Sequence, residues 1–575
     1  MAFGLLSLLP PAIAILLAIV TRRVVAPLAF AVLCGSAILS RDAVGWTAWG
    51  EQTVTGFVIS VRDSVFDYDH RRALVFSLLL GAMVGVLEAG GGMKSLVARL
   101  ARNIRTRRGG QTLITSLGLG IFFDDYANTL LIGGTMRTTA DRFGISRAKL
   151  AYLVDSTAAP VAGLSPISTW VVSEISYVAA GLAVAAAGSD VSAFALFMAS
   201  MPFRFYAIFA LVMVFTIAIS DRDFGPMWSL GLTAGKPPQT ETLDRPKPGS
   251  ETDPAQRARS WRRALIGPQN WYRGPAFESH LTPDAQSFSP KLWMAAVGPV
   301  AGCVAVVIGS LYASGRGAIT VETIGIVRIA GTIISNGDSY QALIHGGAAG
   351  LALAIILHRG IGGARTTTLL GGAMRGAMQM LPAMLILWLA WALSDQTGED
   401  RLDSGGYLAS RLSEQVSPYF LPTAVFVVAA AVAFSTGTSW GTMAILTPLA
   451  IELSLKIGTT SADLAADPMG PICVATVGSV LAGAIFGDHC SPLSDTTILS
   501  SRASGCDHLV HVRTQMPYAL SVGLISILCG TLPAARGVSP YVCIAGGSIA
   551  ILSMVYVFGK KGPAGFADTQ GSDQI

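Results

Sequence analysis

The feature that most constrains this chain is the recurrence of long apolar segments along most of its 575 residues. Segments of roughly 18–25 apolar residues have the length of an α-helix that crosses the hydrocarbon core of a bilayer. Only 13% of the residues are charged, which is about half of the share usual in a soluble protein and too little to cover the surface of one. The sequence therefore predicts an all-α polytopic membrane protein and argues against a large soluble α/β enzyme with buried helices.

About eleven segments are predicted to cross the membrane in full. The first resembles a signal peptide in composition, but no small-residue cleavage site precedes a soluble domain and a second apolar segment follows at once, so we interpret it as a membrane helix. The predicted spans lie near residues 4–20, 24–40, 73–90, 150–182, 192–219, 292–312, 340–357, 368–394, 470–500, 517–535 and 540–558.

Two other apolar stretches, 111–136 and 419–450, differ from these spans. Basic loops flank the first on both sides, and because Lys and Arg collect in cytoplasmic loops, both of its ends belong inside. Its middle reads IFFDDYANTLLIGG, and acids at that depth are tolerated only where they line a protein cavity. We therefore expect a re-entrant hairpin whose tip is Asp124 to Thr129. The second stretch has a polar middle, FSTGTSWGT, and flanks poor in Lys and Arg, which suits the outer side.

Each hairpin is followed by a segment that Pro and polar residues interrupt, 150–182 in the first half and 470–500 in the second. The two hairpins enter from opposite sides, which predicts inverted-topology repeats, each with a re-entrant hairpin and a broken transmembrane helix. The basic loops place the N-terminus outside and the C-terminus in the cytoplasm. The predicted parts are an N-terminal membrane half (1–220), a polar cytoplasmic linker (221–290), a C-terminal membrane half (291–558) and a cytoplasmic tail (559–575).

The four interrupted elements are expected to meet at one site, because helix breaks at matching positions of inverted repeats mark the binding site of a transporter. Carboxylates, hydroxyls and freed backbone carbonyls supply the oxygen ligands that Na+ takes. Burial raises the pKa of a carboxyl group, so a proton and a cation compete for it. The predicted cation- and proton-binding residues, and the ligands of Na+, are Asp124, Asp125, Asn128, Thr129, Asp155, Ser156, Thr157, Thr438, Ser439, Asp488, Ser491, Ser494, Asp495 and Thr496.

Three further residues are possible proton carriers: Glu174, His345 and His489. His345 lies within an apolar span, where a histidine is more often a packing or hydrogen-bonding residue. His489 stands beside Cys490, but two ligands without a second pair do not make a zinc site, so we expect no transition metal. No GxxxxGK[ST] motif occurs, which argues against an ATP-driven pump, and neither a cofactor nor a nucleic-acid partner is expected.

Four motifs resemble those of the NhaC family of sodium/proton antiporters: FFDDYANTLLIGGTMR, KLAYLVDSTAAPVAGLSPISTW, STGTSWGTMAILTPLA and IFGDHCSPLSDTTILSS. The resemblance covers about 70–220 and 290–535. It implies sodium ions and protons as substrates, membrane lipid as surroundings, and a place in the cytoplasmic (inner) membrane. Through the wider ion-transporter superfamily it also implies a homodimer, with a scaffold domain that dimerises and a transport domain that moves like an elevator.

The hairpin tips depart from one branch of that superfamily, the divalent-anion/sodium symporters, which carry Ser-Asn-Thr at both tips. Here the first tip has the sequence Ala-Asn-Thr at Ala127–Thr129, and the second has the sequence Gly-Thr-Ser at Gly437–Ser439. The oxygen ligands are kept, and the added Asp124 and Asp125 favour a cation. Sodium/proton exchange is therefore the predicted activity.

Two other functions compete with this prediction. The first is sodium- or proton-coupled exchange of a small organic acid or amino acid, since some relatives of the family resemble malate/lactate exchangers. An organic anion would require a buried Arg or Lys or a helix N-terminus, and the four motifs that form the predicted site contain neither basic residue in their core. The second is a membrane enzyme with His489, Ser491 and Asp495 as a triad, but these lie on one segment, whereas triad members converge from distant parts of a chain. We expect no enzymatic activity.

Overall fold

The computed structural model describes residues 3–21, 23–101, 104–185, 191–231, 291–319, 333, 336–398, 400–404, 407, 417–460 and 467–562. Most of the predicted linker (from residue 232) and most of the predicted tail (from residue 563) lie outside the described residues. Within this part of the chain, nine helices are long and apolar enough to cross a membrane, and a tenth is obtained if two helices that meet at 46° form one span. The prediction of a polytopic α-helical membrane protein is confirmed.

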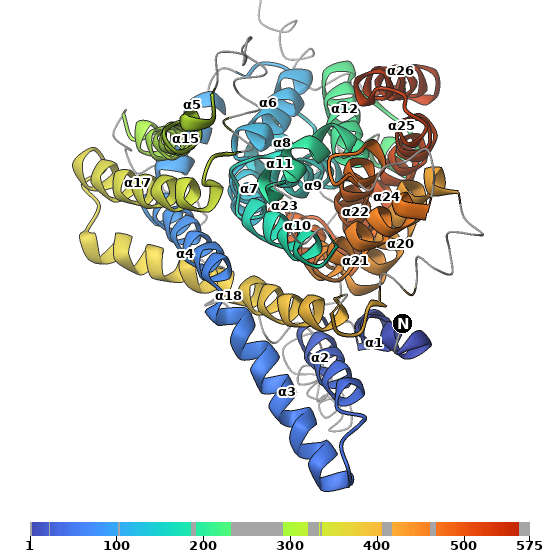
Figure 1. The fold of residues 1–575 in the computed structure, drawn as a ribbon. Helices are drawn as coiled ribbons and strands as arrows, with labels where there is room; N and C mark the ends of the chain where they lie inside the picture. Colours follow the sequence, from blue (N-terminus) through green and yellow to red (C-terminus); the bar gives the residue numbers. More distant parts are fainter. Residues whose placement is uncertain are drawn as a thin grey trace, which may run out of the picture.

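The helices form two groups (Figure 1). In the first, which we call the α18 group, α18 packs against α4, α2 and α3, and α17 packs against α4 and α15. Glycines bring two of these backbones into contact: a Cβ at Gly85 of α4 would lie 2.1 Å from the carbonyl oxygen of Gly372 on α18. The group comprises α1 (Leu9–Thr21), α2 (Val25–Leu39), α3 (Trp46–Phe66), α4 (Tyr68–Ala89), α5 (Gly92–Ala101), α15 (Met294–Gly315), α17 (Ser339–Gly360) and α18 (Thr366–Thr397).

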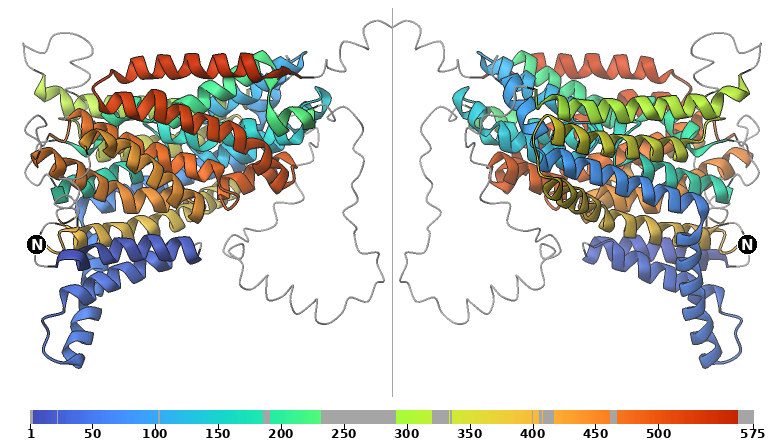
Figure 2. Two further views of the ribbon diagram at one scale, coloured as in Figure 1. Left: turned by 90° about the vertical axis from the view of Figure 1, so that its right-hand side faces the viewer. Right: turned by 90° about the vertical axis from the view of Figure 1, so that its left-hand side faces the viewer.

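The second, which we call the broken-helix group, contains the four predicted interrupted elements. Figure 2 shows most of the long helices of both groups running roughly parallel, with α3 standing across them. The group comprises α6 (Arg107–Gly120), α7 (Asp125–Thr135), α8 (Arg137–Arg142), α9 (Arg147–Leu164), α10 (Val171–Ala185), α11 (Ala193–Ser200), α12 (Phe205–Ser220), α13 (Gly225–Gly231), α20 (Leu421–Thr436), α21 (Ser439–Thr460), α22 (Pro471–Cys490), α23 (Asp495–Ser504), α24 (His508–Ile525), α25 (Leu532–Ala535) and α26 (Pro540–Phe558).

Two short strands join the end of α12 to the end of α26. Strand β1 (Arg222–Asp223) pairs antiparallel with β2 (Lys560–Lys561). The remaining elements are 3-10 turns at Gly4–Leu8, Met201–Phe203, Arg316–Ala318 and Pro418–Phe420 and a π-helical turn at Ser526–Thr531.

The helix breaks fall where Pro and Gly predict them. The break between α9 and α10 contains Pro166, and the break between α22 and α23 contains Pro492. The first hairpin tip lies at Ile121–Asp124, a few residues before the predicted one, because Asp124 caps α7 by accepting a hydrogen bond from the backbone N–H of Ala127 at 2.7 Å. A capping residue stands outside the helix that it begins.

One long helix, α3, is missing from the sequence prediction. Its charged residues, which include Glu51, Arg62 and Asp63, lower its hydropathy below that of a membrane span. In Figures 1 and 2 α3 projects from the body of the molecule beside α2. Several of its side chains on the projecting part are exposed, although they are apolar, among them Val54 and Val58.

The interrupted elements of the two halves pack in matching ways. Helix α6 packs on α9 as α20 packs on α22, and α7 packs on α23 as α21 packs on α10. Helices that hold the same position in the order of the two halves therefore have corresponding neighbours. The opposite orientation of the two repeats, the topology of the termini and the division into two membrane halves, linker and tail stay predictions.

Candidate functional site

In the first half, the hairpin tip is tied to the break between α9 and α10. The backbone N–H of Thr169 in the break donates to the carbonyl of Phe123 in the tip at 2.9 Å. Asn128 on α7 donates through Nδ2 to the carbonyl of Gly118 on α6 at 2.7 Å and to that of Thr157 on α9 at 3.0 Å. Its Oδ1 is buried without a hydrogen-bond partner among the described residues, and it is thus an oxygen available to a cation.

In the second half, the tip between α20 and α21 lies against the break between α22 and α23. Gly437 ends α20 with a φ of +70°, and a Cβ there would lie 2.6 Å from the backbone of Leu493. A glycine is required because other residues rarely adopt this φ and have no room at this contact. Ser491 makes the second link, donating through Oγ to the carbonyl of Phe434 at 2.7 Å.

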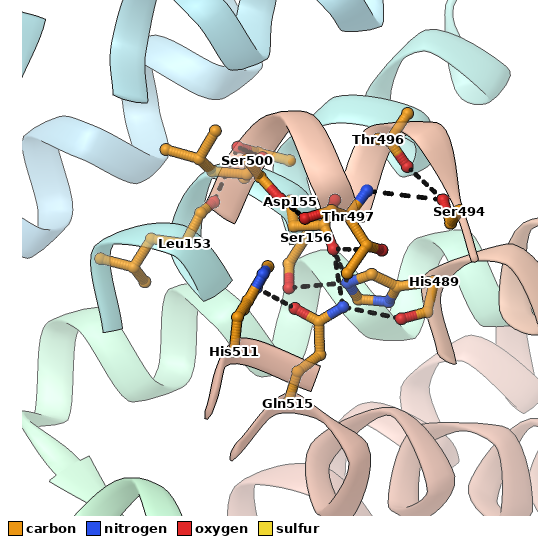
Figure 3. A network of polar contacts seen from close by, with 12 residues as sticks. Leu153, Asp155, Ser156, His489, Ser494, Thr496, Thr497, Ser500, His511 and Gln515 are labelled. Atoms are coloured by element: carbon orange, nitrogen blue, oxygen red, sulfur yellow. Dashed lines mark hydrogen bonds and ion pairs between the residues drawn. The ribbon is translucent and has the colours of Figure 1, made fainter. Parts of the chain in front are cut away.

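Asp155 on α9 joins the two halves (Figure 3). Its carboxylate is 1% exposed, and Oδ2 accepts hydrogen bonds from Thr497 Oγ1 on α23 at 3.1 Å and from Gln515 Nε2 on α24 at 2.7 Å. His489 Nε2 on α22 lies 3.9 Å from the same oxygen. The second oxygen, Oδ1, is buried and has no hydrogen-bond partner among the described residues, so half of this carboxylate is free for a proton or a cation.

Asp125, in the first turn of α7, is the acid with the fewest contacts. It is 2% exposed, and neither carboxylate oxygen has a hydrogen-bond partner in the described part of the chain. Trp170 Nε1 is likewise buried without a hydrogen-bond partner among the described residues. A buried carboxylate without partners is costly as an anion. The site therefore favours either a bound proton or a bound cation at this residue.

Asp488 on α22 is the third buried acid, 4% exposed, with Oδ1 lacking a partner within the described ranges. It lies within electrostatic range of Asp155, Asp125 and Asp495, so the structure brings acids of both halves together. Asp495 differs from the other acids because it is exposed on the surface of the chain. The expectation that all four leading carboxylates are buried is wrong for Asp495, which is exposed in the first turn of α23.

The other predicted ligands have mixed surroundings. Thr129 is fully buried and its Oγ1 has no partner among the described residues. Thr157 bonds back to the carbonyls of its own helix. Ser494 caps α23 and contacts Thr496 Oγ1 at 2.9 Å. Four more predicted ligands lie as follows: Asp124 caps α7, Ser156 is buried on α9, Thr438 is half-buried in the second tip, and Ser439 is buried at the start of α21.

The three possible proton carriers lie apart. Glu174 on α10 forms an ion pair with Arg204, whose Nη1 lies 2.7 Å from its Oε2, and both side chains are buried. His345 is exposed on α17 in the α18 group, where Ser310 and Gln341 bond its ring. Only the third, His489, belongs to the site.

His489 lies inside the network of Figure 3. Its Nδ1 bonds Tyr206 Oη on α12 at 2.7 Å, and its Nε2 bonds Ser156 Oγ at 3.2 Å. Among the described residues, no group of three or more His, Cys, Asp or Glu side chains is arranged to hold a metal ion. Hydroxyl and carbonyl oxygens would therefore have to complete the coordination of a cation.

Four contributing residues were not singled out from the sequence: Arg204, Tyr206, Thr497 and Gln515. Gln515 is the last polar residue of the first half of α24, directly before an apolar stretch, and a polar residue at membrane depth is a signal of function. Arg204 follows the 3-10 turn between α11 and α12, in a segment that was treated as one continuous span. Tyr206 and Thr497 carry no such signal, because hydroxyls are common in membrane helices.

Comparison with known proteins identifies relatives of this chain. A family described as the Na+/H+ antiporter family matches residues 168–531. An uncharacterised protein of Haemophilus influenzae is 31% identical over 519 residues, which is 90% of this chain and 88% of that protein. Short matches include a malate-2H(+)/Na(+)-lactate antiporter of Bacillus subtilis, 31% identical over 121 residues (21% of this chain and 23% of that protein), and the arginine/ornithine antiporter ArcD of Halobacterium salinarum, 37% identical over 113 residues (19% and 21%).

Among solved structures, the YdaH transporter of Alcanivorax borkumensis is similar, with 12% identity and a TM-score of 0.49. That match covers 94% of this chain and 99% of the other. This chain spans less than a quarter of the B. subtilis and H. salinarum antiporters named above.

Proposed function

Because the chain belongs to the Na+/H+ antiporter family, a family of membrane transporters, we propose that it exchanges sodium ions for protons across the cytoplasmic membrane. Exchange without ATP requires one site that holds either ion but not both. Asp125, Asp155 and Asp488 are the groups that we assign to this competition. The predicted hydroxyl and amide oxygens, Thr129 and Asn128 first among them, would complete the shell of the sodium ion.

The observation that carries this proposal is that the three buried acids have carboxylate oxygens without a hydrogen-bond partner. Each has at least one carboxylate oxygen that is buried and without a hydrogen-bond partner among the described residues. A buried oxygen of this kind is stable when a proton or a cation occupies it and costly when neither does. In the described part of the chain, no Lys or Arg forms an ion pair with any of the three acids, so the counter-charge has to come from the transported ion.

The division into two groups of helices supports an elevator-like movement as part of the proposal. The four interrupted elements all belong to the broken-helix group, and they meet the α18 group mainly where α10 and α21 pack on α18. A site built within one group can move with that group as a rigid body against the other. Dimerisation through the α18 group is the corresponding proposal for the oligomeric state.

Exchange of a small organic acid or amino acid is the second candidate, and the specific observation in its favour is the match to antiporters of malate, lactate, arginine and ornithine. Two buried basic residues lie beside the first broken span, Lys149 on α9 and Arg204 before α12, but Asp223 and Glu174 neutralise them. Neither side chain is therefore free to bind an organic anion.

The test is ion flux in vesicles reconstituted with purified protein. An outward or inward sodium gradient alone should drive proton movement in the opposite direction, with no organic solute present. Asp125→Asn and Asp155→Asn should abolish this flux, and protein-free vesicles give the background leak. Flux that appears only after malate, lactate, arginine or ornithine is added would replace this proposal with the second candidate.

A further inference from the structure

Two histidines share one serine beyond the site, at the start of α24. Ser501 Oγ on α23 lies 2.8 Å from Nδ1 of His511 and 3.2 Å from Nδ1 of His508. It also lies 2.6 Å from the carbonyl oxygen of Thr497, one turn back on its own helix. His511 is fully buried and His508 is half-buried. We call these three residues the histidine–serine cluster.

The neighbours of the cluster determine where each ring carries its ordinary proton. Gln515 Nε2 donates to the carboxylate of Asp155 and to the carbonyl of His489, both at 2.7 Å. These two acceptors fix the orientation of the amide, so Gln515 Oε1 faces His511 Nε2 at 2.9 Å and accepts a hydrogen bond from its N–H. Likewise His508 Nε2 lies 2.7 Å from the carbonyl of Pro492 and must donate to it.

When both Nε2 atoms carry a proton and both rings are neutral, the cluster lacks one hydrogen-bond donor. Each Nδ1 is then an acceptor, while the Ser501 hydroxyl has a single hydrogen to donate. The Thr497 carbonyl has another donor in Ser500 Oγ at 3.1 Å, but one Nδ1 stays unpaired, which is costly in a buried cluster. One added proton on either Nδ1 removes the shortage, because that ring then donates to Ser501 Oγ and the hydroxyl donates to the other Nδ1. A second proton would place two cations side by side.

The cluster is connected to the ion site by a single amide. The Gln515 amide lies between the Asp155 carboxylate and the His511 ring (Figure 3). It bonds the carboxylate at 2.7 Å and the ring at 2.9 Å. A positive charge on the cluster stabilises the ionised form of Asp155 and disfavours the proton that Asp155 would otherwise hold. The basic loop that contains Arg502 and Arg513 predicts that this end of α24 faces the cytoplasm.

We propose that the histidine–serine cluster, His508–Ser501–His511, is a second proton-binding site that faces the cytoplasm and adjusts the proton affinity of Asp155 through Gln515. It binds one proton between two imidazole rings, and it is distinct from the carboxylates that exchange the transported ions. Its effect on transport rests on the function proposed above, whereas its proton binding does not.

Titratable and charged groups approach the cluster from several neighbouring helices. Helix α24 packs against α9, α12, α13, α22, α23 and α26. The titratable groups of these helices nearest to it are Asp155 on α9, Tyr206 on α12 and His489 on α22, all connected through the network described above, and Arg502 on α23. Asp507 caps α24 itself, and Asp223 contacts α24 further along, through Tyr518.

The proton site is tested by solid-state NMR of full-length protein in liposomes, labelled with heavy nitrogen at histidine and titrated from about pH 8 to about pH 5, the range in which histidine takes up a proton. Wild-type protein should show one added proton shared by His508 and His511. His508→Gln and Ser501→Ala should lose it, and the matched control His70→Gln, at the other end of the molecule, should keep it. If both Nδ1 atoms of the wild-type cluster stay unprotonated across this range, the proposal is overturned.

The coupling to Asp155 is tested by the pH dependence of sodium-driven proton flux. Loss of the cluster charge in His508→Gln should move the pH of half-maximal flux upward, by up to about one unit for a charge at this separation in a protein interior. A superimposable profile would overturn the coupling. If sodium drives no flux in any variant but the NMR titration is as expected, the proposed function fails and the proton site stands.

Discussion

Glu174→Gln is the most informative single substitution, because it decides whether Glu174 carries protons or holds the first broken span in place. Arg204 and Glu174 are 0% and 2% exposed at their side chains, and Arg204 Nη1 also donates to the carbonyl of Gly163 near the end of α9. The pair thus connects α10 and α12 to the helix that carries Asp155. We expect this connection to be structural.

The magnitude follows from what the substitution leaves behind. Removing one partner of a buried ion pair costs about 3–5 kcal/mol, because the other charge stays buried. Arg204 would retain the Gly163 carbonyl and the ring of Phe197, whose centre lies 4.5 Å from the guanidinium carbon. A cation–π contact of this kind offsets about 1 kcal/mol. We therefore expect Glu174→Gln to lower the free energy of unfolding by about 3 kcal/mol, at the lower end of that range.

The assay is the unfolding midpoint of purified protein in detergent, followed by tryptophan fluorescence. The matched control is Asp395→Asn, which breaks the ion pair with Arg401 at 3.2 Å, where both partners are 42–52% exposed. Solvent screens that pair, so a loss of at most about 1 kcal/mol is expected. The double variant Glu174→Leu with Arg204→Met removes both charges and should be more stable than Glu174→Gln alone.

The reasoning is refuted if Glu174→Gln unfolds like wild type but no longer exchanges ions. That result would mean that Arg204 does not depend on Glu174 for its counter-charge, and that the carboxyl group itself carries the proton.

Three further predictions concern other parts of the molecule. Asp488→Asn should abolish exchange while expression and membrane insertion stay at wild-type levels, and a wild-type rate would remove Asp488 from the site. Gly437→Ala should slow exchange about tenfold or more, because a Cβ at this left-handed position meets Leu493; an unchanged vesicle flux would show that the second tip tolerates displacement. Burial raises the pKa of Asp338, but hydrogen bonds from Arg72 and from the Gln341 backbone outweigh it and hold that pKa below its ordinary value. Asp338 therefore stabilises the fold above its unfolded-state pKa and loses this effect as the pH falls through the folded-state pKa. Asp338→Asn should cost about 1 kcal/mol near neutral pH, a small value because the residue is 46% exposed, and the difference in unfolding midpoint from wild type should vanish once the pH is below the folded-state pKa of Asp338; a difference that persists in strong acid would contradict the assignment.

The membrane-spanning character of the chain and the positions of its helix breaks were predictable from the sequence, because both depend on local properties. A run of apolar residues has to be covered by lipid or protein, and Pro166, Pro492 and Gly437 interrupt helices wherever the chain carries them. The acids of the site were predictable for a related reason: a carboxylate in an apolar segment is too costly to be there by chance.

Helix α3 shows the limit of that local argument. Its charges place it below the hydropathy of a membrane span, and its contacts with α18, which is a distant part of the chain, are visible only in the fold. Asp495 shows the same limit at the site. Its position in an interrupted apolar segment predicts burial, but the first turn of α23 directs it to the surface, and the direction of a side chain depends on how its helix is rotated against its neighbours.

The chemistry of neighbouring residues was enough to predict that this protein lies in a membrane, that its helices break at four places, and that acids stand close to most of these breaks. The partners of the buried side chains are visible only in the fold: Asp155 shares Gln515 with His511, Glu174 is neutralised by Arg204, and Asp125 has no hydrogen-bond partner among the described residues. Partnership depends on which helices pack side by side, and residues 30 to 360 positions apart come together only through that packing.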